Sequence, residues 1–186
     1  ARHAHAPWPS WHHIEHIQSI DPADVPRFAE LGVVANIQPL WARLEPSVSE
    51  VALPLVGEER GRWMYAFRSL VDAGAMPVLS SDWTVSTLNP FQILETAITR
   101  QPPKAEGDFP VFLPEQRLTL DECVEGYTIN AARAGWREAT TGSLAPGKWA
   151  DFIVIDRDLW ATDPRDIGDT EVLATYLAGK PVHGGI

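Results

Sequence analysis

The stretch Val33–Leu40 reads Val-Val-Ala-Asn-Ile-Gln-Pro-Leu and decides the fold class. It is mostly apolar and begins with β-branched residues, which is typical of a strand buried on both faces of a parallel sheet. Pro39 has no N–H to give to a strand ladder, so the strand is expected to end at a loop there. We therefore expect an α/β fold.

The segments around this strand alternate between strand and helix patterns. Strands are expected over residues 12–18 and 76–80, and helices over residues 21–32, 60–73 and 89–98. Two of these helices open on Asp21-Pro22 and Asn89-Pro90, pairs that supply an N-cap and a first-turn proline. Residues 41–59 have no firm period and are predicted to form a long loop, either over the mouth of a site or as a peripheral insertion. Strand–helix units in this order over residues 12–101 indicate parallel βα units.

The pattern changes after Trp136. Before it, a capping box at Thr119 and Glu122 opens a helix that runs to about Ala134. After it come turn-forming residues 142–148, an apolar run over 152–155, and a predicted hairpin that pairs residues 172–177 with 181–183. We expect two parts: βα units over residues 1–136 and antiparallel strands over residues 137–186.

Composition excludes several classes of protein. The chain has 186 residues, a net charge of -10 and 25 acidic against 15 basic residues, so a nucleic-acid partner is not expected. Its 45% hydrophobic content is enough for a sizeable core. Cys123 is the single cysteine, which rules out an internal disulfide and suits a reducing compartment such as the cytoplasm. No apolar run reaches the roughly 18 residues of a membrane span and no signal peptide opens the chain, so no membrane partner is expected.

The first candidate functional residue is His16, in His12-His13-Ile14-Glu15-His16. It lies nearest the carboxyl end of the predicted strand, where α/β proteins gather their catalytic groups. A neutral imidazole there suits a divalent metal such as zinc. The alternative interpretation is a hydrogen-bonded histidine of the core.

The second candidate is Asp82, which directly follows the strand over residues 76–80. A carboxylate in that place must be paired, metal-bound or open to solvent, because an unpaired buried charge is costly. The alternative is a helix or loop cap. Together, His16 and Asp82 at the ends of two strands favour a metal or acid–base site.

Other patterns are weaker candidates. His3-Ala4-His5 has the spacing of a metal pair but follows no apolar strand, and Ser80 or Ser81 beside an acid lacks the glycine-rich elbow of a nucleophile. Cys123 is predicted to be structural. Trp41 and Trp83 each follow a strand end, and either wall an apolar substrate pocket or cap the core.

Four stretches, in order, resemble the amidohydrolase superfamily, specifically the amidohydrolase 3 family of metal-dependent hydrolases. Residues 12–18, His-His-Ile-Glu-His-Ile-Gln, resemble the motif of the family's sixth barrel strand, and residues 79–85, Leu-Ser-Ser-Asp-Trp-Thr-Val, that of the eighth. Residues 128–132 resemble the helix after the barrel. Residues 142–152, Gly-Ser-Leu-Ala-Pro-Gly-Lys-Trp-Ala-Asp-Phe, resemble the segment that leads into the family's small β-sandwich.

This resemblance implies a hydrolase of C–N bonds in small molecules such as amides, formamides or cyclic amides. A divalent metal, usually zinc, would activate water by lowering its pKa from 15.7 towards about 7. His16 would be the metal ligand of the sixth strand. Asp82 would bind metal, take the proton from water and give it to the leaving nitrogen.

The resemblance also implies what is missing. The family's first-strand His-x-His pair, its metal-bridging residue and its fifth-strand histidine have no counterpart in the chain, and a complete (β/α)8 barrel needs about 250 residues. We therefore expect roughly strands six to eight of a TIM barrel plus the C-terminal share of a β-sandwich, with a missing N-terminal half or a second copy completing the protein.

Two other functions stay open. One is a truncated, non-catalytic fragment that folds by self-association, because most metal ligands are absent. The other is an acidic interaction module that uses tryptophans such as Trp8, Trp11 and Trp63.

Overall fold

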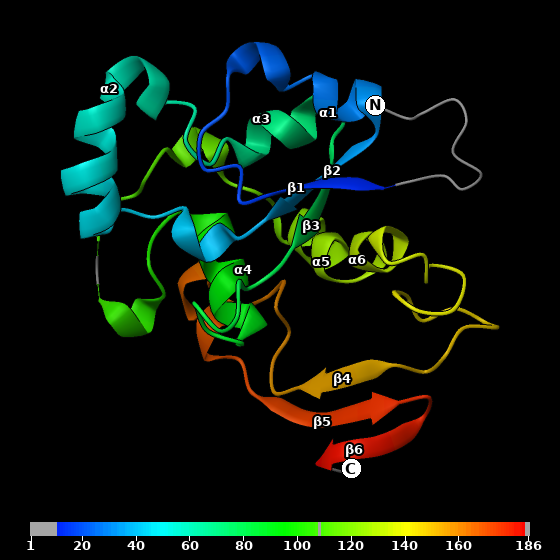
Figure 1. Ribbon diagram of the computed structural model, residues 1–186. Coiled ribbons are helices and arrows are strands. Elements are labelled where there is room, and N and C mark those ends of the chain that lie inside the picture. Colours follow the sequence, from blue (N-terminus) through cyan, green and yellow to red (C-terminus); the bar gives the residue numbers. More distant parts are fainter. Residues whose placement is uncertain (1–10, 108, 185–186) are drawn as a thin grey trace.

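The computed structural model describes residues 11–107 and 109–184, and it contains two three-stranded sheets (Figure 1). The first holds β1 (His12–Glu15), β2 (Val33–Ile37) and β3 (Met76–Leu79), all parallel and in that order. The second holds β4 (Phe152–Ile155), β5 (Val172–Leu177) and β6 (Lys180–Gly184), all antiparallel. Parallel βα units followed by antiparallel strands are thus confirmed. The predicted His3–His5 pair lies outside the described residues.

The connection from β1 to β2 is helical but shorter than a single helix over residues 21–32. It consists of a 3₁₀ turn, η1 (Pro22–Asp24), and helix α1 (Arg27–Leu31). The Asp21 carboxylate accepts a hydrogen bond from the N–H of Ala23 at 2.9 Å, and Gly32 ends α1 with a left-handed φ of 62°. The predicted N-cap at Asp21 is therefore confirmed, and the helical segment ends at residue 32 as expected. Pro26 divides the segment, since proline has no N–H to continue a helical ladder.

The segment after β2 differs from the predicted loop and helix. A short turn, η2 (Pro39–Trp41), is followed by a π-helix, η3 (Ser47–Ala52), and by α2 (Leu53–Gly61). The sequence shows no helical period there because α2 is mostly exposed, with Leu55 at 77% exposure. The helix predicted over residues 60–73 is broken where Met64 pairs with Ser19, so that α3 covers only Phe67–Asp72.

The helices after β3 follow their predicted caps. Asn89 caps α4 (Pro90–Thr99), and both halves of the Thr119–Glu122 capping box are formed at the start of α5 (Leu120–Tyr127). Two 3₁₀ turns, η4 (Lys104–Glu106) and η5 (Pro114–Gln116), lie between them. Helix α6 (Ile129–Ala134) follows, and its Asn130 side chain donates to the carbonyl of Pro77 in β3 at 3.1 Å. Helices α5 and α6 both pack against β3 of the parallel sheet.

The C-terminal sheet is joined to the rest of the molecule through a 3₁₀ segment, η6 (Pro164–Asp169), which packs on α4. Arg165 forms an ion pair at 2.8 Å with Glu95 of α4, whose side chain is 1% exposed. Ile167 and Leu159 lie in the same hydrophobic core as Ile37 of β2. Residues after 136 therefore share one core with the βα units. No helix in the described part of the chain is long and apolar enough to cross a bilayer.

Candidate active site

His16 and Asp82 lie at the same edge of the parallel sheet. His16 follows the carboxyl end of β1, and Asp82 lies three residues beyond the carboxyl end of β3, with β2 between them. Both have left-handed backbone, with φ of 62° at His16 and 61° at Asp82. This conformation is uncommon for residues other than glycine and is enriched where function constrains the chain.

The side chains of His16 and Asp82 have potential metal-binding atoms that contact no other polar group of the described residues. The His16 side chain is exposed and that of Asp82 is half-buried. Among residues 11–107 and 109–184, neither the imidazole of His16 nor the carboxylate of Asp82 has a hydrogen-bond or ion-pair partner. The interpretations of His16 as a hydrogen-bonded core residue and of the Asp82 side chain as a cap thus find no support in these contacts.

A polar network lies beside these two residues. The Glu15 carboxylate accepts hydrogen bonds from the side-chain amides of Asn36 at 2.9 Å and Gln38 at 3.1 Å. Ser80 donates to Asn36 Oδ1 at 3.0 Å and accepts from Gln38 Nε2 at 2.7 Å. Sequence reasoning missed this network, although Asn36 and Gln38 alternate with Ala35 and Ile37 at the end of an apolar strand. That period of two was the available signal, because alternate strand residues share a face.

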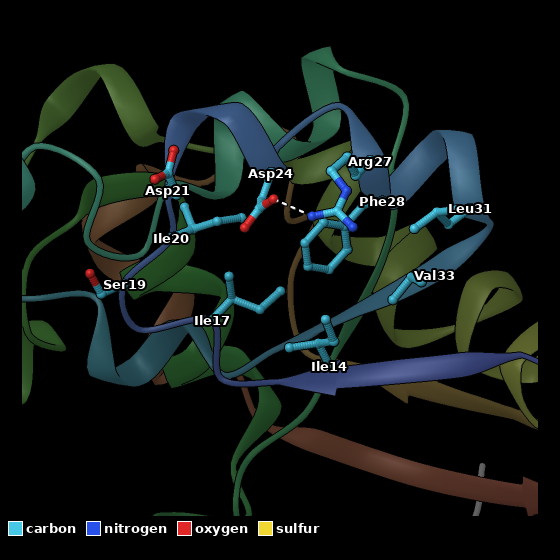
Figure 2. Close-up of a pocket in the computed structure, with 10 residues that line it drawn as sticks. All are labelled: Ile14, Ile17, Ser19, Ile20, Asp21, Asp24, Arg27, Phe28, Leu31 and Val33. Atoms are coloured by element: carbon cyan, nitrogen blue, oxygen red, sulfur yellow. Dashed lines mark hydrogen bonds and ion pairs between the residues drawn. The ribbon is translucent and has the colours of Figure 1, made fainter. Parts of the chain in front are cut away.

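The opposite face of the sheet is apolar. Figure 2 shows Ile14 and Val33 pointing from β1 and β2 toward Phe28 and Leu31 of α1, around a cavity of about 300 Å³. Asp24 and Arg27 form an ion pair at 2.5 Å across its rim. Since Glu15 alternates with Ile14, this cavity and the polar network lie on different faces of the sheet.

The remaining predicted residues have mixed surroundings. Trp83 is 62% exposed beside Asp82, whereas Trp41 is half-buried and packs against the core. Burial raises the pKa of the Cys123 thiol, as expected for a structural cysteine. Trp11 lies against Trp136, with ring centroids 6.0 Å apart, while Trp63 packs on the core. Trp11 and Trp63 therefore have separate contacts, and Trp8 lies outside the described residues.

The side chains of His16 and Asp82 could supply part of the ligand set that a divalent metal needs. An imidazole nitrogen and a carboxylate oxygen are ordinary zinc ligands, and here both are free. Zinc sites use three or four protein ligands, and the described residues contain no group of three or more His, Cys, Asp or Glu side chains that could hold an ion. His16 and Asp82 are therefore two candidate ligands, fewer than such a site uses.

The structure is thus an α/β protein with a parallel sheet, and an imidazole and a carboxylate lie at the carboxyl edge of that sheet. The profile described as "Amidohydrolase family" matches residues 1–183. The chain belongs to this family.

Curated relatives include the protein LONG AFTER FAR-RED 3 of Arabidopsis thaliana, 36% identical over 170 residues that make up 91% of this chain and 28% of that protein. The N-substituted formamide deformylase of Arthrobacter pascens is 34% identical over 116 residues, which are 62% of this chain and 21% of the enzyme. The chain thus spans less than a third of the length of these relatives.

Solved structures show the same fold. An uncharacterized metal-dependent hydrolase from Pyrococcus horikoshii matches with a TM-score of 0.65 and 25% identity, over 82% of this chain and 30% of that one. An adenosine deaminase from Xanthomonas campestris with bound zinc matches with a TM-score of 0.59 and 21% identity, over 91% of this chain and 36% of that one.

Proposed function

We propose that this chain carries His16 and Asp82 as two metal ligands of a hydrolase that cleaves C–N bonds in small molecules. The observation that carries the proposal is the pair of free donors on left-handed backbone at one edge of the parallel sheet. Membership of the amidohydrolase family supports it, as do a formamide deformylase among the relatives and a zinc-bound deaminase among the structures.

The metal, with zinc as the first choice, would lower the pKa of water towards about 7 and so supply a nucleophile at neutral pH. The imidazole of His16 would hold the metal through a ring nitrogen. A carboxylate oxygen of Asp82 would accept the proton of the attacking water and return it to the leaving nitrogen. Substrates would be amides, formamides or cyclic amides. Trp83, exposed beside Asp82, and Trp41, after β2, would line the substrate pocket.

The chain would correspond to about strands six to eight of a TIM barrel over residues 1–136 and to strands of the small β-sandwich over residues 137–186. The further ligands would then come from outside the described residues, either from more polypeptide or from a second copy of the chain. The single cysteine supports a cytoplasmic setting.

A second candidate is a non-catalytic fragment that self-associates. It is favoured by an exposed apolar face on the C-terminal sheet, where Ile153 is 47%, Leu173 50% and Leu177 56% exposed. This candidate predicts a stable dimer that binds no zinc at His16 and Asp82.

Zinc titration of the 186-residue chain, followed by calorimetry and NMR, tests the proposal. We expect weak 1:1 binding, with a dissociation constant that rises at least tenfold in His16→Ala and in Asp82→Asn. His183→Ala, which removes an exposed histidine of β6, is the matched control and leaves binding unchanged. Binding that both site variants leave at the wild-type level would overturn the assignment.

Activity is assayed with an N-substituted formamide and a cyclic amide, with the same variants alongside; because the further ligands would come from outside the described residues, we expect the chain with added zinc to be inactive or slow by itself. Any hydrolysis that disappears in both His16→Ala and Asp82→Asn supports their place in the site. Hydrolysis that survives both site substitutions would remove His16 and Asp82 from the reaction.

A further inference from the structure

Gln38 lies at the centre of the polar network, immediately after β2. Its side chain is 3% exposed, although it carries a polar carboxamide. A buried amide is costly unless its donors and acceptor are paired, and here each is. The burial and the complete pairing together hold this side chain in one orientation.

The carboxamide of Gln38 contacts both segments that carry the candidate ligands. Its Oε1 atom accepts from the backbone N–H of His16 at 2.8 Å. Its Nε2 atom donates to the hydroxyl of Ser80, two residues before Asp82, at 2.7 Å. The amide orientation is determined by chemistry, since only the oxygen of the carboxamide can face the N–H of His16.

The neighbouring groups reinforce this link. Gln38 Nε2 also donates at 3.1 Å to Glu15, which directly precedes His16. Asn36 connects Glu15 to Ser80, but within the described part of the chain Gln38 is the residue whose side chain bonds to His16 itself. The backbone of His16 is further held by Asn36, whose carbonyl oxygen accepts the same N–H at 3.0 Å.

We infer that Gln38 is a positioning residue that sets the placement of His16 relative to Asp82 by bonding to the ends of both β1 and β3. The inference rests on the proposed function, because it takes these two residues as the metal ligands. Groups that hold ligands in place contribute to metal affinity without touching the metal, and their loss commonly weakens binding 10- to 100-fold.

The test compares Gln38→Met with Gln116→Met in the 186-residue chain. Methionine keeps the length of the side chain and removes every hydrogen bond of the amide. Gln116 is the matched control because it is also buried, at 7% exposure, and bonds Ser69 through both ends of its amide, at 3.1 Å to the backbone N and 2.9 Å to the hydroxyl. It joins η5 to α3 and has no bond to the segments of His16 or Asp82.

Two readouts are measured on each variant. The first is the zinc dissociation constant, which we expect to rise about tenfold in Gln38→Met and to change less than twofold in Gln116→Met. The second is taken without metal: the NMR chemical shifts of the His16 and Asp82 backbone amides, together with hydrogen exchange at the His16 N–H. We expect both amides to shift, and exchange at His16 to accelerate, in Gln38→Met alone.

The outcomes separate this inference from the proposed function. If wild-type zinc binding ignores His16→Ala and Asp82→Asn, the proposed function fails, and the metal-free amide readouts then decide whether Gln38 places the two residues. If zinc binding depends on both ligands but Gln38→Met matches the control, the positioning role is wrong. Unmoved amides at His16 and Asp82 in Gln38→Met would likewise overturn it.

Discussion

The contact between α5 and β3 makes a sharp prediction for Gly126→Ala. A Cβ atom on Gly126 would overlap the Cδ1 atom of Leu79 and would lie 3.4 Å from its Cγ and 3.6 Å from its backbone N. Leu79 is 3% exposed, so its side chain cannot move into solvent. Leu79 is also the last residue of β3, three positions before Asp82, and a shift of this strand would move the candidate site.

The expected magnitude follows from two opposing effects. Overpacking a buried contact costs about 2–3 kcal/mol. Replacing glycine by alanine inside a helix regains about 1 kcal/mol. We therefore expect Gly126→Ala to lower the free energy of unfolding by about 1–2 kcal/mol.

Urea denaturation followed by circular dichroism measures this change. Gly135→Ala is the control, because its added Cβ meets nothing closer than the Ala131 carbonyl oxygen at 3.5 Å and its φ of -89° suits any residue. We expect that control to stay within about 0.5 kcal/mol of wild type. In a Leu79→Ala background the overlap is gone, so Gly126→Ala should then be neutral or stabilising. A Gly126→Ala protein as stable as wild type would refute the reasoning.

Three other substitutions give expected outcomes. Burial raises the pKa of the Cys123 thiol above its value in the unfolded chain. The protonated thiol therefore makes its full contribution to the free energy of unfolding below about pH 8, and this contribution is lost as the pH rises. By pH 10, urea denaturation should show that wild type has lost about 2 kcal/mol more than Cys123→Ala. Glu95→Ala removes a carboxylate that is 1% exposed and pairs with Arg165 at 2.8 Å, and should cost about 3 kcal/mol in the same assay, with faster hydrogen exchange across η6; wild-type exchange there would contradict the role of the pair. Gly142→Ala places a methyl group 2.6 Å from Ala132 Cβ at a φ of 82°, and it should lower the melting temperature by several degrees. Gly147→Ala is the control, because Gly147 also has a positive φ, of 90°, but its added methyl group would meet nothing within 4 Å; it should lower the melting temperature less.

Local signals were sufficient for much of this structure. Asp21, Asn89 and Thr119 each cap a helix or helical turn, as their neighbours in sequence predicted, because capping depends on residues two or three positions away. The order of strands and helices followed from apolar periodicity for the same reason. His16 and Asp82 could be placed at strand ends once the strands were recognised.

Long-range contacts decided the rest. The helix predicted over residues 60–73 is interrupted because Met64 pairs with Ser19, and no local pattern reports a partner 45 positions away. The exposed helix α2 lacks an apolar stripe, so its sequence resembles a loop. In the first case a long-range contact breaks a helix that the local pattern predicts, and in the second a helix forms where the local pattern predicts none.

The candidate site shows the same division. The sequence by itself determined which residues carry donor atoms and that each follows a strand. Only the tertiary structure brought Gln38 to both of their segments, across separations of 22 residues to His16 and 42 to Ser80. The physical reason is that a parallel sheet aligns the ends of distant strands at one edge, where hydrogen bonds form between side chains that no sequence period connects.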